Sequence, residues 1–305
     1  MSIRQQHANT YAAVAQLDGA VSEVEQQRLE RQGEVYRRLA SWTLEALGLA
    51  SGQRVLEVGA AVGRCSWPPL LAAARVGQTG RVVGIDRDPR LVDAARAKVA
   101  HLPWVEVTEA DGLAYQPPVP FDAVHCRLVL MHQHAPEAFL AHLVSLARPG
   151  GRVAAQEYDA DGLPCFPAFA AFERMIDAGL EAIQHVGADF QAGRKLLDRF
   201  QRAGLRDVRV EAEAPYVPFL DARLEVMLDG FTVVGGLAER AGAMLTAEYE
   251  ALVSKIRAAH WDPSYASYLV RLPTLVAAVG TWPGVAGDDA QGRRSRCDLA
   301  PLEVP

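Results

Sequence analysis

Apolar residues between positions 20 and 50 recur at a spacing of three or four among charged residues. This spacing places them on one face of a helix. The apolar positions that share this face are Leu29, Val35, Leu39, Trp42, Leu44 and Leu47. The pattern predicts an amphipathic N-terminal helical arm or cap over residues 1–50.

The next hundred residues change pattern, because short apolar runs now alternate with helical stretches of about a dozen residues. The predicted strands cover residues 54–58, 82–86, 104–108, 123–126 and 152–156, with helices after the first, second and fourth strands. This alternation is typical of βαβ units and a parallel sheet. We therefore expect an α/β core over residues 51–160.

The rest of the chain is predicted to alternate between core and insertion. A helical insertion is expected over 161–190, and a helical lid insertion over 220–271. Between them, residues 191–219 should return to the core, with a strand at 208–212 where apolar and polar residues alternate. Residues 272–284 should hold the last core strand, pairing antiparallel at the sheet edge. The tail, residues 285–305, is poor in large apolar residues and is expected to be disordered.

Composition reduces the number of possible partners and kinds of site. Lys and Arg number 31 against 37 Asp and Glu, a net charge of −6 that does not favour nucleic acid as a partner. The four cysteines are far apart, without the spacing of a metal site or a disulfide framework. The first residues carry no apolar stretch typical of a secretory leader, and no uncharged apolar run reaches the length expected of a membrane span. We expect a cytoplasmic protein with a small-molecule partner, no metal and no membrane association.

The most informative segment is VLEVGAAVGR at 55–64, an apolar strand that ends in small residues. Small residues let a ligand approach the backbone closely. The segment GID at 84–86 ends the next strand in a carboxylate, which can accept both ribose hydroxyl hydrogens of a nucleoside. A dinucleotide fold would instead place a third glycine where this chain has Arg64. The spacing favours a nucleoside ligand without a pyrophosphate.

These segments, with EADG at 109–112, FDAVHCR at 121–127 and RPGGR at 148–152, resemble the class I S-adenosylmethionine-dependent methyltransferases. The resemblance is to the small-molecule branch related to quinone biosynthesis. It implies a Rossmann-like methyltransferase fold, a mostly parallel seven-stranded sheet with helices on both faces, and S-adenosylmethionine as cofactor.

The resemblance also implies cofactor-binding positions. Those near the methionine part are Tyr11, Glu57, Gly59, Ala61, Gly63, Cys126 and Arg127, and those near the ribose and adenine are Asp86, Arg87, Asp111 and Gly112. Tyr11 would close over the cofactor from the arm, although a packing role is an equal alternative. The family pattern has glycine where this chain has Ala61.

The acceptor site should follow the fourth and fifth strands, because ligands of open α/β sheets lie at the carboxyl ends of the strands. The candidate residues are Glu157, Tyr158 and Asp159, with His132 as a candidate base. The alternative for Glu157 and Asp159 is that they cap the following helix or face solvent. The alternative for His132 is a partly exposed histidine without a role in catalysis. His125 is expected to be packed in the core.

The insertions are rich in aromatic residues, of which Trp261 and Tyr265 are the most pocket-like candidates. An apolar lid would exclude water from the sulfonium and suit a flat acceptor. We therefore expect methyl transfer to a small aromatic or hydrophobic metabolite in natural-product tailoring. The alternative is a relative that binds the cofactor without methylating, such as a cyclase, hydroxylase, decarboxylase or non-catalytic binding protein. A homodimer through the N-terminal arm is also left open.

Overall fold

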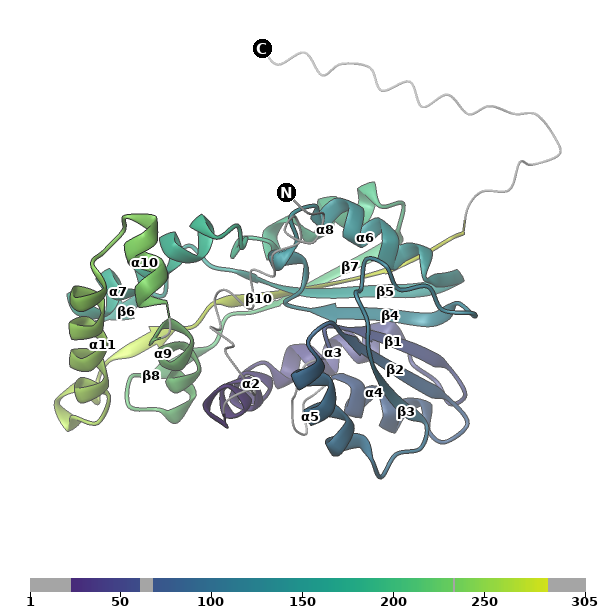
Figure 1. Ribbon diagram of the computed structural model, residues 1–305, viewed down its shortest axis with the longest axis horizontal. Helices are drawn as coiled ribbons and strands as arrows, with labels where there is room; N and C mark the ends of the chain where they lie inside the picture. Colours follow the sequence, from purple (N-terminus) through teal and green to yellow (C-terminus); the bar gives the residue numbers. More distant parts are fainter. Residues whose placement is uncertain (1–22, 61–67, 233, 285–305) are drawn as a thin grey trace, which may run out of the picture.

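The computed structural model describes residues 23–60, 68–232 and 234–284 of the 305 residues (Figure 1). Seven strands form the main sheet in the order β3-β2-β1-β4-β5-β10-β7. Their bounds are β1 Arg54–Val58, β2 Arg81–Asp86, β3 Val105–Glu109, β4 Phe121–Arg127, β5 Ala147–Asp159, β7 Arg206–Glu213 and β10 Thr274–Thr281. Strands β1 to β5 are parallel, and β10 is antiparallel to β5 and β7. The predicted mostly parallel seven-stranded sheet is confirmed.

The position of the last strand differs from the prediction. Strand β10 lies inside the sheet, between β5 and β7, and its six inner residues are all buried. The edge strand is β7, which is largely exposed and carries charged residues along its length. Charged residues are a common way to protect a sheet edge from pairing with another chain. The hydrophobic pattern identified both strands but did not determine which neighbours each one has.

Helices cover both faces of the main sheet (Figure 1). On one face lie α3 Arg37–Leu47, α4 Pro68–Val76 and α5 Pro89–Val99, which share an apolar core with β1, β2 and β3. On the other lie α6 Pro136–Ser145 and α8 Leu196–Arg202, packed on β1, β4 and β5. Helix α2, Glu23–Val35, precedes α3, so the described part of the predicted arm is two consecutive helices.

A second, three-stranded sheet continues the main one. Strands β6 Cys165–Phe166, β9 Leu269–Arg271 and β8 Tyr216–Pro218 have the order β6-β9-β8, which repeats the order β5-β10-β7. Each short strand directly follows or precedes its longer counterpart in the sequence. The three breaks between them contain Pro164, Pro215 and Pro273. Proline has no backbone N–H to donate to a sheet, so each strand is interrupted at the same level.

The second sheet carries a helical lobe at one end of the molecule (Figure 1). The lobe contains α7 Ala170–His185, α9 Glu225–Thr232, α10 Gly235–Ala241 and α11 Thr246–His260, which form an apolar core with the buried side of the small sheet. The sequence predicts helices in this region, but no second sheet. Strands of two or three residues are too short to show a period of two.

Four short 3₁₀ helices complete the described part of the chain. They are η2 Leu130–His132, η3 Gly193–Lys195, η4 Ala222–Leu224 and η5 Pro263–Tyr265. Two of them, η2 and η3, lie at the carboxyl end of the main sheet, next to the predicted site.

Candidate functional site

The turn after β1 requires glycine at position 59. Gly59 has a φ of +73°, and a Cβ there would lie 2.5 Å from Cγ2 of Val129. The backbone N–H groups of Gly59 and Ala60 both donate to the carbonyl of Ile85, at 2.9 and 3.0 Å. This pair of hydrogen bonds fixes the turn at the carboxyl end of β2. Ala61 and Gly63 lie outside the described residues, as does Tyr11.

The carboxylate predicted to hold the ribose lies beside this turn. Asp86 is the last residue of β2 and is half-buried, and its Oδ1 accepts a hydrogen bond from the backbone N–H of Asp88 at 3.0 Å. The side chain of Arg87 is exposed, and so is that of Asp111, whose Oδ1 accepts from the N–H of Leu113 at 2.9 Å. The structure therefore brings Gly59 and Asp86 together at adjacent strand ends, with Asp111 beyond the neighbouring strand.

Gly112 also lies where a side chain would not fit. A Cβ there would be 2.9 Å from Cγ1 of Val58 and 3.1 Å from Cζ of Phe139. Close packing against β1 and α6 explains this glycine. The predicted contact of Gly112 with the cofactor stays a prediction.

Glu57 forms a buried pair with a histidine. Its Oε2 lies 2.6 Å from Nδ1 of His125, and each residue is only 3% exposed. The two residues are direct partners in the register of β1 and β4. His125 is buried as predicted, but in a polar pair and not in apolar packing. The signal available in the sequence was a polar residue between two apolar neighbours in each of these strands.

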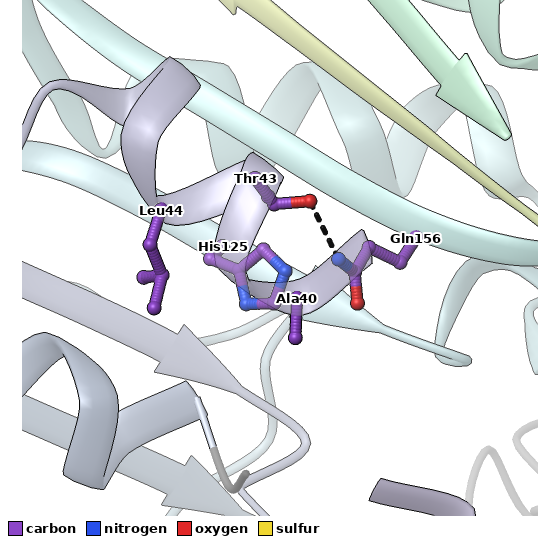
Figure 2. Close-up of a pocket in the computed structure, with 5 residues that line it drawn as sticks. All are labelled: Ala40, Thr43, Leu44, His125 and Gln156. Carbon is purple, nitrogen blue, oxygen red and sulfur yellow. Dashed lines mark hydrogen bonds between the residues drawn. The ribbon is translucent and has the colours of Figure 1, made fainter. Parts of the chain in front are cut away.

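A small pocket borders this pair between α3 and the sheet. Figure 2 shows that Ala40, Thr43 and Leu44 of α3 face His125 and Gln156 across it. The amide of Gln156 donates to Oγ1 of Thr43 at 2.6 Å. Nε2 of His125 and Oε1 of Gln156 are buried and have no hydrogen-bond partner in the described part of the chain. Three polar side chains, Thr43, His125 and Gln156, therefore lie together between α3 and the strands.

Glu157 lies under the turn that follows β4. Its Oε1 accepts hydrogen bonds from the backbone N–H groups of Val129 and Leu130 at 3.0 and 2.7 Å, and Oε2 accepts from Met131 at 3.3 Å. Glu157 is fully buried. Burial raises its pKa to about 7, against the lowering effect of the three hydrogen bonds. Because both oxygens are engaged by the backbone, the geometry favours a positioning role over contact with an acceptor.

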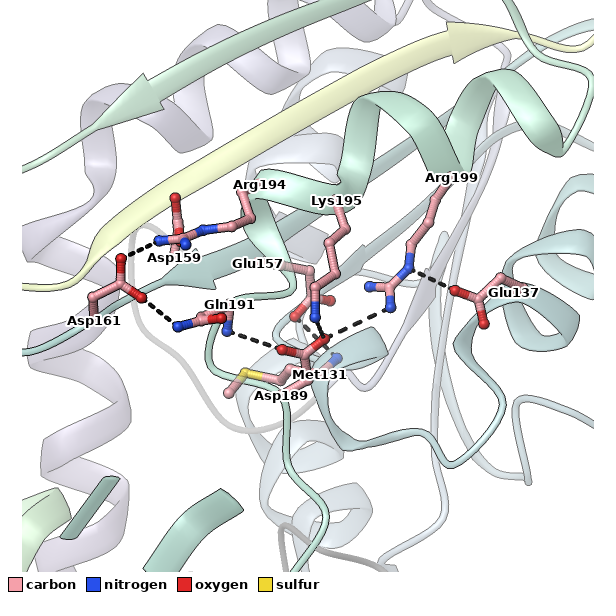
Figure 3. A network of polar contacts seen from close by, with 10 residues as sticks. All are labelled: Met131, Glu137, Glu157, Asp159, Asp161, Asp189, Gln191, Arg194, Lys195 and Arg199. Carbon is pink, nitrogen blue, oxygen red and sulfur yellow. Dashed lines mark hydrogen bonds and ion pairs between the residues drawn. The ribbon is translucent and has the colours of Figure 1, made fainter. Parts of the chain in front are cut away.

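The turn that Glu157 holds is itself strained. Leu128 has a φ of +56°, a left-handed conformation that is uncommon for a residue with a side chain. Figure 3 shows that a second group of contacts supports the same turn from the loop before α8. The N–H of Asp189 donates to the carbonyl of Met131 at 2.8 Å. The carboxylate of Asp189 pairs with Lys195 at 2.6 Å and with Arg199 at 3.6 Å.

The other two acceptor-site candidates point to different surroundings. The hydroxyl of Tyr158 accepts from the side-chain amide of Gln32 in α2 at 2.6 Å, and the tyrosine is only 4% exposed. Asp159 pairs with Arg194 (Figure 3). Successive residues of a strand point to opposite faces, so three consecutive residues cannot line one pocket together.

His132 lies at the end of η2 and is half-buried. Burial, and then the positive charges of Arg87 and Arg28, lower its pKa to about 4. The imidazole is therefore neutral near pH 7, when it has one N–H donor and one lone pair. A base with so low a pKa is weak, so a neutral hydrogen-bonding role fits His132 better than proton abstraction.

The lid aromatics have mixed positions. Phe169, Phe219, Tyr265 and Tyr268 form a cluster with ring centroids 4.9 to 6.3 Å apart. Trp261 is 69% exposed and lies against His260, with ring centroids 4.9 Å apart. Tyr265 is thus part of the packing of the lobe. A role for either residue in acceptor binding stays a prediction.

Cys126 and Arg127 end β4. The Cys126 thiol is buried in the core formed with α6 and α8, and burial raises its pKa well above the usual value. Its side chain is therefore not available to a ligand. The guanidinium of Arg127 has a buried Nη1 with no hydrogen-bond partner in the described residues.

The sheet order, the glycine turn after β1 and the carboxylate that ends β2 together define the Rossmann-like methyltransferase fold. A family model described as a methyltransferase domain matches residues 30–210, and the chain belongs to this family. No helix in the described residues has the length and apolar character needed to cross a membrane.

Two curated proteins are similar over part of the chain. An uncharacterized 37.1 kDa protein in a transposon of Streptomyces fradiae is 33% identical over 130 residues, 42% of this chain and 36% of that protein. A ubiquinone biosynthesis O-methyltransferase of Xylella fastidiosa is 34% identical over 111 residues, 34% of this chain and 41% of that protein. The chain thus spans less than half the length of each of these relatives.

A solved structure covers more of the chain. Phosphoethanolamine N-methyltransferase 2 of Haemonchus contortus, in complex with phosphomonomethylethanolamine and S-adenosylhomocysteine, has a TM-score of 0.56 and 16% identity. The match covers 90% of this chain and 59% of that chain. At this identity, the likeness shows a shared fold.

Proposed function

We propose that the chain binds S-adenosylmethionine at the carboxyl ends of β1 and β2 and catalyses methyl transfer to a small aromatic or hydrophobic metabolite. The observation that carries the proposal is the Gly59 turn bonded to the end of β2, directly beside the Asp86 carboxylate, in a chain of the methyltransferase family. A bare turn and a strand-end carboxylate are the groups that fit a ribose and its substituents.

The residues present suit this cofactor in chemistry as well as in position. Asp86 supplies hydrogen-bond acceptors for ribose hydroxyls, and Arg127 supplies a buried Nη1 donor that has no hydrogen-bond partner among the described residues. When bound, the cofactor supplies a methyl group that is already activated by a sulfonium charge. The protein's part is therefore mainly to position the acceptor and exclude water.

Positioning falls to the turn after β4 in this proposal. Glu157 holds the backbone N–H groups of Val129, Leu130 and Met131 from below, and Asp189 holds the carbonyl of Met131 from the side. His132 directly follows this turn. Its neutral imidazole would orient a polar group of the acceptor by hydrogen bonding.

The helical lobe and the names of two relatives indicate the acceptor class. The helical lobe is rich in aromatic residues, and the ubiquinone O-methyltransferase of Xylella fastidiosa and the demethylmenaquinone methyltransferase of Shouchella clausii bear names that indicate quinone precursors. We propose a flat phenol or quinol as the acceptor and a tailoring role in a metabolic pathway.

The experiment is incubation of the purified chain with S-adenosylmethionine labelled in its methyl group and a panel of phenols and quinols. Mass spectrometry then follows the label. A labelled product supports methyl transfer. Tight binding of S-adenosylhomocysteine with an unlabelled, rearranged product supports the alternative of a cyclase, hydroxylase or decarboxylase. No binding of either cofactor form contradicts the proposal.

A further inference from the structure

Arg127 is placed between the sheet and the N-terminal arm. Side chains of β4 alternate, so Arg127 points to the same face as Ala123 and His125, the face covered by α3. Its neighbour Cys126 points into the opposite core. Arg127 also ends the strand and is the register partner of Gln156 on β5. Arg127 therefore lies at the carboxyl edge of the sheet, and its guanidinium is close enough to Glu57 of β1 and Tyr158 of β5 to be influenced by their charges.

The guanidinium is charged and incompletely paired. Burial lowers the pKa of Arg127, while the nearby Glu57 carboxylate and Tyr158 hydroxyl act to raise it. An arginine side chain nevertheless stays protonated in a protein. No hydrogen bond joins it to Glu57 within the described residues, and its buried Nη1 has no partner there. A buried donor without an acceptor is costly, particularly when it is charged.

The acidic groups near Arg127 are engaged elsewhere. Glu57 bonds to His125, and Glu157 accepts from three backbone N–H groups on the opposite face of β5. Arg28 of α2 acts electrostatically on both Tyr158 and His132, and Arg87 acts on His132. Arginine side chains, Arg127 included, therefore act on the groups around Tyr158 and His132.

We propose that the guanidinium of Arg127 binds a carboxylate of a ligand held at the carboxyl edge. The planar guanidinium fork matches a carboxylate with two parallel hydrogen bonds, which a lysine cannot reproduce. The inference rests on the proposed function and assigns to Arg127 a ligand contact through its side chain. The carboxylate can belong to the amino acid part of the cofactor or to the acceptor.

Calorimetry with two nucleosides separates the two sources. S-adenosylhomocysteine carries the amino acid part, whereas 5′-methylthioadenosine lacks it. If the cofactor supplies the carboxylate, Arg127→Gln weakens S-adenosylhomocysteine binding about 10- to 100-fold and leaves 5′-methylthioadenosine unchanged. If the acceptor supplies it, both nucleosides bind normally. In that case the complex with S-adenosylhomocysteine binds benzoate more tightly than benzyl alcohol in the wild type but not in Arg127→Gln.

Arg81→Gln is the matched control. It makes the same chemical change at the start of β2, at the opposite end of the sheet, where Arg81 is exposed and pairs with Glu106. Neither nucleoside should lose affinity in this variant. If Arg127→Gln does not fold, Arg127→Lys keeps the charge without the planar fork and should show the same selective loss, about tenfold.

Two outcomes count against the inference in different ways. Unchanged affinity for S-adenosylhomocysteine and unchanged benzoate preference in a folded Arg127 variant overturn the assignment of Arg127 and leave the proposed function intact. A wild-type chain that binds neither nucleoside overturns the proposed function and this inference with it.

Discussion

Gly59 determines how closely the chain after β1 can approach the turn after β4. Two separate features require glycine at this position. One is its positive φ, and the other is the close contact of 2.5 Å that a Cβ would make with Cγ2 of Val129. The first is a property of the local backbone, and the second depends on a residue seventy positions further along the chain. The sequence reveals the need for a small residue, but only the folded chain shows which contact requires it.

Gly59→Ala should destabilise the protein more than Gly242→Ala. Gly242 has a φ of +76°, close to that of Gly59, but nothing lies within 4 Å of its Cβ position. Both variants lose about 1 kcal/mol to backbone strain, and only Gly59→Ala adds a clash. Urea unfolding measures the difference, and Val129→Ala should recover part of it in the double variant. Equal losses in the two alanine variants would contradict the role of Val129.

Asp86→Ala should weaken S-adenosylhomocysteine binding at least about tenfold, since a charge-assisted hydrogen bond contributes about 1.5–3 kcal/mol. Titration calorimetry measures the affinity. Asp93→Ala is the control, because Asp93 lies on the neighbouring helix α5 with its side chain 76% exposed. An affinity that is the same for both variants would reject the ribose assignment of Asp86.

At the scale of elements, the turn after β4 is held by side chains from other elements. Glu157 comes from β5 and Asp189 from the segment between α7 and α8. The turn combines a left-handed Leu128 with three backbone N–H groups that no strand or helix partner satisfies locally. Such a conformation persists only where surrounding groups compensate for it.

Glu157→Gln should lower turnover about tenfold while cofactor affinity stays within about twofold, because the amide places an NH₂ donor against one of the three backbone donors. Steady-state kinetics and calorimetry measure the two effects. Glu137→Gln makes the same change at an exposed residue that pairs with Arg199, and its turnover should match the wild type. Full turnover in Glu157→Gln would rule out the positioning role.

Glu157 should also leave a pH signature in stability. Its pKa is raised from 4.5 to about 7 in the folded chain, so between these values the folded state holds a proton that the unfolded state has released. The free energy of unfolding contributed by this group therefore falls as pH rises through this range, and the loss is complete above about pH 7. Urea unfolding of the wild type and Glu157→Gln at several pH values measures the difference. A difference that does not change with pH would contradict a raised pKa.

At the scale of the whole molecule, two cores are joined by three interrupted strands. The core of the helical lobe contains residues from α7, α9, α10, α11 and the small sheet, whereas the main sheet packs with its own helices. The prolines at positions 164, 215 and 273 mark the boundary. Even so, the backbone continues across it, with the N–H of Leu272 bonded to the carbonyl of Pro215 at 2.9 Å.

Two matched substitutions should show how far the two cores are independent. Ile176→Val in α7 and Ile85→Val in β2 each remove one buried methyl group, at a cost of about 0.5–1.5 kcal/mol. Hydrogen exchange should increase mainly in α7, α10 and α11 for the first variant, and in the main sheet for the second. Cofactor affinity should fall only for Ile85→Val, because the Ile85 carbonyl accepts from Gly59 and Ala60. An even increase across both regions would indicate a single cooperative core.

Much of this organisation could be predicted from local pattern. The period of apolar residues identified all seven main strands and the arm, and the glycine turn with the Asp86 carboxylate indicated the site. The small sheet was missed because its strands are only two or three residues long, and the inner position of β10 was missed because hydrophobic period does not specify neighbours. Strand geometry places Glu157, Tyr158 and Asp159 on two faces of the sheet. The prediction that all three line one pocket did not take this alternation into account.

The sequence by itself determined the properties that depend on neighbours along the chain, namely the strands of the main sheet, the helices around them, the glycine turn and the carboxylate that ends β2. The tertiary structure decided what each polar side chain meets: His125 for Glu57, three backbone N–H groups for Glu157, and no described partner for Nη1 of Arg127. The reason is physical. A buried polar group is stabilised by atoms that are distant in the sequence, and those atoms come within hydrogen-bonding distance only when the sheet has assembled.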